Sequence, residues 1–210
     1  NHIIYHSIML AGIVVGAMRF SKLSASSRWF FLLLAITPLI ELTGYFCALR
    51  YRNNSPVSNS FSLIEYSIFC LAFYIDTRIR PVMLLLACGL LFSIGNSLLF
   101  QEFLKEQATN TTLILSLCQI IIYFLFLILY FKTVDTVSLR QFPMFWIGLG
   151  TMVFSIVSIV AFGYLEFGEK GTTWYNVAGY TRKYANYLLY LSYIPAFLSP
   201  QKCLYDFTAR

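Results

Sequence analysis

Charged residues are scarce in this chain of 210 residues: Asp, Glu, Lys and Arg make up only 11% of it, whereas hydrophobic residues make up 59%. A water-soluble domain typically carries about 25% charged residues. No stretch within the sequence is polar enough to form a separate soluble domain such as a kinase or a nuclease. We therefore predict a single domain, residues 1–210, of the all-α polytopic membrane class.

Histidine, paired cysteine and internal repeats are also lacking. The only histidines, His2 and His6, lie in one short stretch, which is too few to build a metal site with carboxylates from elsewhere. The 5 cysteines have no paired or metal-type spacing, so we expect free thiols that are buried as small apolar side chains. The absence of a repeat argues against an inverted-repeat transporter. We predict no metal and no cofactor.

Long apolar runs dominate what is present. A helix needs about 20 apolar residues to cross a bilayer, and unbroken runs of that length favour helices over the alternating strands of a barrel. Prolines 56, 81 and 143 each stand at or near the first position of a run, where a missing N–H costs a helix nothing. The sequence predicts seven transmembrane helices: Ile3–Phe20, Trp29–Leu49, Val57–Ile75, Val82–Gln101, Thr111–Phe131, Pro143–Leu165 and Trp174–Ser199.

Basic residues are distributed unequally between the two sides of this arrangement. Cytoplasmic loops of membrane proteins carry an excess of Lys and Arg. One set of alternate connections, with the C-terminal end, holds Arg19, Lys22, Arg28, Arg78, Arg80, Lys132, Arg140, Lys202 and Arg210, and the other set holds Arg50, Arg52, Lys105 and Lys170. We therefore predict an N-terminus outside and a C-terminus in the cytoplasm. The net charge of +6 is explained by the lipid bilayer as partner, and nucleic acid is not expected.

Strongly polar residues recur at one depth in several predicted helices. With a rise of about 1.5 Å per residue, Glu41 and Glu65 each lie roughly 12 Å inside the outer end of their segments, and Arg182 lies at a similar depth. An Arg or Lys near the bilayer centre costs roughly 2.5–3.5 kcal/mol, so such residues normally face the bundle interior. The predicted site comprises Glu41, Glu65, Asn96, Gln119, Arg182, Lys183, Asn186, Tyr187 and Tyr190.

Two interpretations of this cluster remain open. It is either a tyrosine-lined pocket that opens outward and takes a small or lipidic ligand, or a buried ion-pair network that holds helices together. The pocket predicts a sensing or binding module read by a separate membrane or cytoplasmic protein. The network predicts a structural or accessory subunit of a larger membrane complex. A transporter or membrane-embedded hydrolase would need a polar path or a water-activating group that the sequence does not display, so we do not expect an enzyme.

Three hydrophobic blocks resemble a known group of proteins. They are FSLIEYSIFCLAFY at Phe61–Tyr74, LSLCQIIIYFLFLILYF at Leu115–Phe131 and FPMFWIGLGTMVFSIVSIVAFG at Phe142–Gly163. Together they resemble an uncharacterised family of short bacterial seven-helix inner-membrane proteins. The resemblance implies seven helices and a location in the bacterial inner membrane, and it brings no catalytic residues to transfer.

Overall fold

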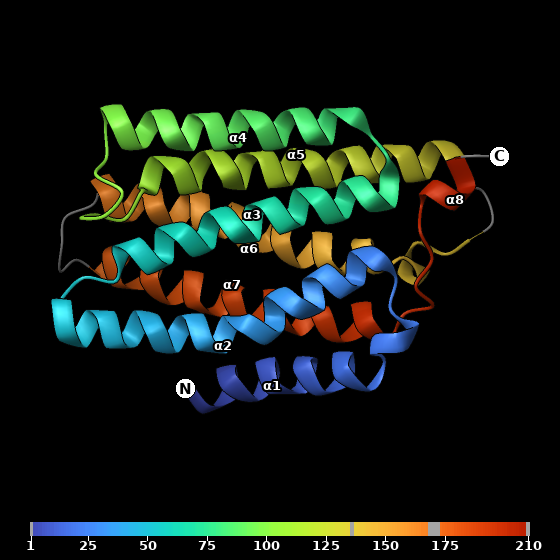
Figure 1. Cartoon of the computed structure of the whole chain (residues 1–210), viewed down its shortest axis with the longest axis horizontal. Coiled ribbons are helices and arrows are strands. Elements are labelled where there is room, and N and C mark those ends of the chain that lie inside the picture. Colours follow the sequence, from blue (N-terminus) through green and yellow to red (C-terminus); the bar gives the residue numbers. More distant parts are fainter. Residues whose placement is uncertain (1, 135–136, 168–172, 209–210) are drawn as a thin grey trace.

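The computed structural model describes residues 2–134, 137–167 and 173–208. The described part of the chain is all-α, with seven long helices and a short eighth helix near the C-terminus (Figure 1). The helices are α1 (His2–Met18), α2 (Ala25–Tyr51), α3 (Ser55–Thr77), α4 (Arg80–Leu99), α5 (Thr109–Thr133), α6 (Pro143–Phe167), α7 (Thr173–Leu198) and α8 (Tyr205–Thr208). Lys170 and Arg210, which entered the prediction of orientation, lie outside the described residues.

Local sequence signals explain where several helices begin. The side chain of Ser24 caps α2 by accepting a hydrogen bond from the backbone N–H of Ser27. Pro56 and Pro81 lie in the first turns of α3 and α4, and Pro143 opens α6, as the sequence predicts. Pro38 lies inside α2, which changes direction near its middle (Figure 1).

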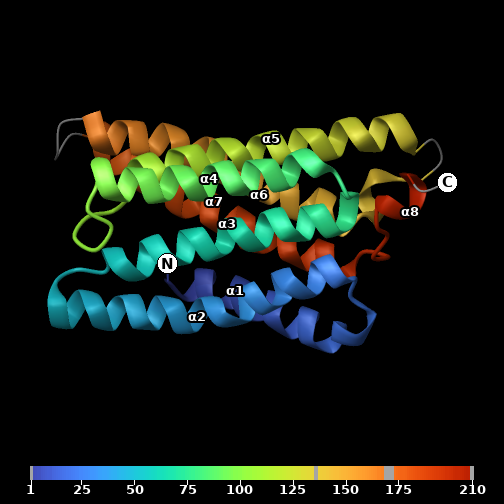
Figure 2. The ribbon, with the colours of Figure 1, turned by 45° about the horizontal axis from the view of Figure 1, so that its top comes forward.

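Four of the described helices, namely α2, α4, α5 and α6, are long and apolar enough to cross a membrane. Figures 1 and 2 both show the seven long helices running along the long axis of the molecule, with α8 at the end opposite the α2–α3 connection. We call the end that holds the α2–α3 and α4–α5 connections the α2–α3 end.

Six of the long helices form a ring, and α4 lies outside it. Packing runs from α1 to α2, α3, α5, α6 and α7, and α7 returns to α1, while α4 contacts only α3 and α5 extensively. The buried residues of α4 are Val82, Gly89, Ser93 and Asn96, which include the small-residue face that the sequence predicts. Cys88 lies on an exposed side of α4, and Cys47 and Cys203 are only half-buried, so the prediction that every cysteine is buried is confirmed only at Cys70 and Cys118.

The interior of the ring is divided along its length. An aromatic cluster fills the half away from the α2–α3 end: the ring of Phe69 lies 4.4 Å from that of Phe73, which in turn lies 5.8 Å from Phe126. The C-terminal segment closes that end, where Leu204 is fully buried and its N–H donates to the carboxylate of Asp76. Polar side chains line the half toward the α2–α3 end.

Candidate functional site

A cavity of about 470 Å³ lies among α2, α3, α5, α6 and α7. This volume falls within the range of about 300–1,000 Å³ that is typical of small-molecule sites. Its polar lining residues are Glu41, Tyr45, Asn54, Ser58, Ser62, Glu65, Tyr66, Thr112, Ser116, Gln119, Arg182, Asn186 and Tyr190. Its apolar wall includes Ile40, Val57, Phe61, Leu115 and Phe154. The lining therefore combines an apolar wall with charges of both signs.

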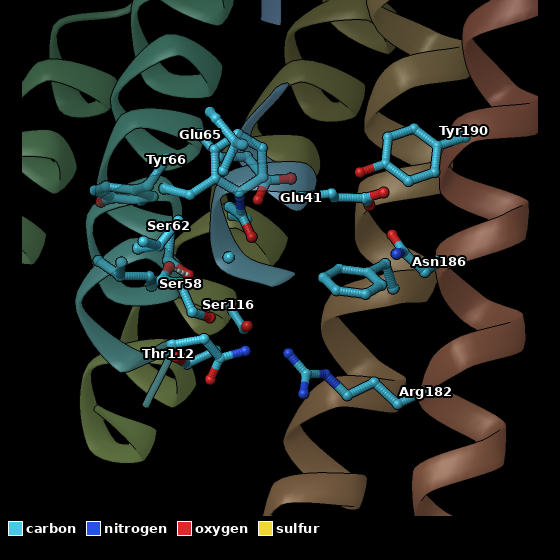
Figure 3. Close-up of a pocket in the computed structure, with 18 of the residues that line it drawn as sticks. Glu41, Ser58, Ser62, Glu65, Tyr66, Thr112, Ser116, Arg182, Asn186 and Tyr190 are labelled. Carbon is cyan, nitrogen blue, oxygen red and sulfur yellow. Dashed lines mark hydrogen bonds between the residues drawn. The ribbon is translucent and has the colours of Figure 1, made fainter. Parts of the chain in front are cut away.

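Figure 3 shows how the labelled side chains face one another. Arg182 extends from α7 into the cavity at the level of Thr112 on α5. Glu65 and Glu41 lie further from the α2–α3 end, near the level of Tyr190. Arg182 therefore occupies the part of the cavity nearer the α2–α3 end, and the two carboxylates form the other end, which we call the floor.

Arg182 is positioned by an aromatic ring and not by an acid. Its guanidinium carbon lies 4.2 Å from the centroid of the Phe162 ring on α6, in cation–π geometry. Among the described residues, the only ion pair within 4.0 Å joins Lys105 to Glu102 on the surface. The charges of Arg182 and Glu65 attract each other across the cavity without direct contact. The side-chain arrangement thus contains no direct ion pair between these two predicted site residues.

Glu41 has a partner that the sequence analysis did not include. The hydroxyl of Tyr5 on α1 donates a hydrogen bond to Oε1 of Glu41, and Nδ2 of Asn186 lies 3.5 Å from the same hydroxyl oxygen. This contact joins α1, α2 and α7. Nothing in the sequence showed which side chain of the first helix would turn toward Glu41.

A second hollow, of about 580 Å³, lies between α1, α2 and α7. Lys183 and Tyr187 line this hollow and not the first cavity. Glu41, Tyr45 and Asn186 line both, so they form the wall between the two spaces. The adjacent cations Arg182 and Lys183 consequently line different hollows, because successive residues of a helix point in different directions.

Asn96 lies away from both spaces. Its side-chain amide donates to Oε1 of Gln101, in the connection between α4 and α5, at 3.0 Å, and to Oγ1 of Thr111, in the first turn of α5, at 3.1 Å. Since α4 lies outside the ring, its buried face meets α3 and α5 and does not reach the cavity. Gln119, by contrast, lines the cavity and accepts a hydrogen bond from Ser155 of α6 at 3.0 Å.

The structure therefore brings together six of the nine predicted site residues in one cavity: Glu41, Glu65, Gln119, Arg182, Asn186 and Tyr190. Within the described ranges, no three His, Cys, Asp or Glu side chains converge in a way that would hold a metal ion. The charged and hydrogen-bonding groups of the lining can contact a polar molecule.

The chain matches no model of a known protein family, no curated protein and no solved structure. What the site does must accordingly be argued from its own geometry.

Proposed function

We propose that this chain is a seven-helix membrane module that senses or binds a small ligand in its cavity. In this proposal α1, α3 and α7 also cross the membrane, although α1 is short, with 17 residues, and α3 and α7 carry more polar residues than the other four. α3 and α7 contain 23 and 26 residues, which is long enough to span, and their charged residues Glu65 and Arg182 turn toward the cavity. We further propose that the N-terminus lies outside and the C-terminus in the cytoplasm of a bacterial inner membrane, and the unequal distribution of Lys and Arg supports this orientation.

One observation carries the proposal: Arg182 and Glu65 face the same cavity, and neither makes an ion pair or a side-chain hydrogen bond with another described residue. Removing a charge from water is costly unless it is paired or hydrogen-bonded. A bound molecule that contacts both groups would supply the missing partners. The same molecule would link α3 to α7 and change how the helices pack.

In this proposal, another protein binds the module and responds to the change in helix packing. The connections between the long helices are short within residues 1–210, and no effector domain lies among them. A ligand shifts a conformational equilibrium only as far as it binds one state better than the other. Glu41, in the floor of the cavity, also accepts the hydrogen bond from Tyr5. A ligand at Glu65 would therefore lie close to the contact that links α1, α2 and α7.

The experiment compares the small molecules that co-purify with a blocked and an unblocked cavity. The protein is reconstituted in lipid nanodiscs, denatured, and the released molecules are identified by mass spectrometry. Ser116→Phe fills the cavity because Ser116 lines it and is 4% exposed. Leu117→Phe is the matched control, because Leu117 is the next residue on α5 and is 48% exposed.

We expect a small molecule to be released from the wild type and from Leu117→Phe but not from Ser116→Phe. Ser62→Leu, on α3, provides a second blocked cavity if Ser116→Phe fails to fold. Identical released molecules from all variants, or none from any, would contradict the proposal.

A further inference from the structure

The cation of the cavity, Arg182, has no anionic partner among the described residues. Arg182 is fixed against Phe162, and none of its N–H groups donates a hydrogen bond to another described residue. A guanidinium carries five N–H donors in a planar fork that matches a carboxylate or phosphate group. Its place in the part of the cavity nearer the α2–α3 end, at the level of Thr112, marks where an acidic group would bind (Figure 3).

The floor presents carboxyl groups with unused hydrogen-bond acceptors. The carboxylate of Glu65 accepts no hydrogen bond from a described residue, and Glu41 has only Oε1 engaged by Tyr5. Two carboxylates face one Arg in this cavity, because Lys183 belongs to the second hollow. A group that carries positive charge and donates hydrogen bonds, such as an ammonium, complements this floor.

Between the two ends, Figure 3 shows the hydroxyl residues Ser58, Ser62 and Ser116 on α3 and α5, and apolar side chains of the same helices lie beside them. These apolar side chains are Val57, Phe61 and Leu115. Such a surface suits a short hydrocarbon linker between two charged groups.

From these three features we infer that the cavity binds a zwitterion, with its acidic group at Arg182 and its ammonium group at Glu65. The inference rests on the proposed function, because it names the class of ligand for the same cavity. Two sources share this chemistry: a free amino acid-like molecule and the headgroup of a zwitterionic phospholipid. The second would enter from the bilayer.

The test measures thermal stability of the full chain with matched probes. In nanodiscs of phosphatidylglycerol alone, the probes are ω-amino carboxylates with two to six carbons, the corresponding carboxylates and the corresponding alkylamines. In a second arm, phosphatidylethanolamine replaces part of the phosphatidylglycerol and no free probe is added. The variants are Arg182→Gln and Glu65→Gln, with Lys183→Gln as control because this adjacent cation lines the other hollow.

We expect at least one amino carboxylate, or phosphatidylethanolamine, to raise Tm, and to bind about tenfold or more tightly than either singly charged parent. Arg182→Gln should abolish the preference for a molecule with an acidic group, and Glu65→Gln the preference for one with an ammonium group. Lys183→Gln should keep both preferences. A response to the free probe identifies a soluble ligand, and a response only to phosphatidylethanolamine identifies a lipid headgroup.

Equal binding of a singly charged parent, or no response to any probe and lipid, overturns the inference. If the blocked-cavity comparison still shows a small molecule released only from open cavities, the proposed function stands and only the class of ligand is wrong. If that comparison also shows no released molecule, the proposed function and the class of ligand are both contradicted.

Discussion

The hydroxyl of Tyr5 donates a hydrogen bond to the carboxylate of Glu41, and this contact joins the first two helices in the wall between the two hollows. A glutamate inside a bundle of apolar helices needs a partner, and here a tyrosine supplies it. Among the described residues, neither Arg182 nor Lys183 forms an ion pair with Glu41. This leaves Arg182 free to bind something that enters the cavity.

Removal of the Tyr5 hydroxyl should destabilise the protein. Tyr5→Phe leaves Oε1 of Glu41 without its donor, and we expect a loss of about 1–2 kcal/mol in the free energy of unfolding in mild detergent. Tyr45→Phe is the control, since Tyr45 lies one turn from Glu41 on α2 and is 61% exposed. Combining Tyr5→Phe with Glu41→Gln should cost less than the sum of the two single changes. Additive costs would show that the two side chains are not coupled.

Two serines on one face of α6 should respond in opposite directions. Ser155 donates to Gln119 at 3.0 Å, whereas the fully buried hydroxyl of Ser158 has no hydrogen-bond partner among the described residues. Ser155→Ala should lower the free energy of unfolding by about 1 kcal/mol, and Ser158→Ala should leave it unchanged or raise it, because an unsatisfied buried hydroxyl is removed. Thermal unfolding of the two variants checks this, and equal destabilisation would show that Ser158 has a partner after all.

Close approach of α6 and α7 depends on Gly150. A Cβ at this position would lie 2.7 Å from Cβ of Ser192 and 3.4 Å from Cα of Leu189, so the two helices would have to move apart. We expect Gly150→Ala to cost about 1–3 kcal/mol. Gly163→Ala, on the same helix but with nothing within 4 Å, should stabilise by about 0.5–1 kcal/mol. Similar Tm shifts for both variants would contradict the packing of α6 against α7.

The C-terminal segment contains a thiol whose ionisation depends on being folded. Burial, and after it the charge of Asp76, raises the pKa of Cys203 to about 12. In the unfolded chain the pKa returns to about 8.5, so folding is favoured below that pH, and this contribution is lost as pH rises from there through about 12.

Maleimide labelling checks this shift in a protein whose other four cysteines are replaced by alanine. The thiolate is the reactive form. At pH 8.5 we expect Cys203 to react about tenfold or more slowly than a thiol introduced by Lys202→Cys in a background that also carries Cys203→Ala. Asp76→Asn should speed the reaction of Cys203. Equal rates at the two positions would mean that the C-terminal segment is not packed against the bundle.

The extent of the helices could be predicted from sequence because the signals are local. Pro56 and Pro81 mark helix starts through the geometry of one residue, and apolar runs determine the lengths. The level of Glu41 and Glu65 followed from counting residues along straight helices. In the structure both residues line one cavity.

The partners of those residues could not be predicted, because they depend on how distant helices rotate and which of them are neighbours. The contact between Tyr5 and Glu41 joins residues 36 positions apart, and that between Asp76 and Leu204 joins residues 128 apart. Asn96 lies at a depth consistent with the prediction but on a helix outside the ring. Depth is a property of one helix, whereas a site is a property of several.

The most direct test of the account is a density map of the protein in native-lipid nanodiscs, at a resolution that shows side chains in the cavity. We predict density for a bound non-protein molecule that contacts both Arg182 and Glu65, and its loss in Ser116→Phe. A cavity in which Arg182 and Glu65 meet in a direct ion pair, with no room for a molecule between them, would contradict the proposal.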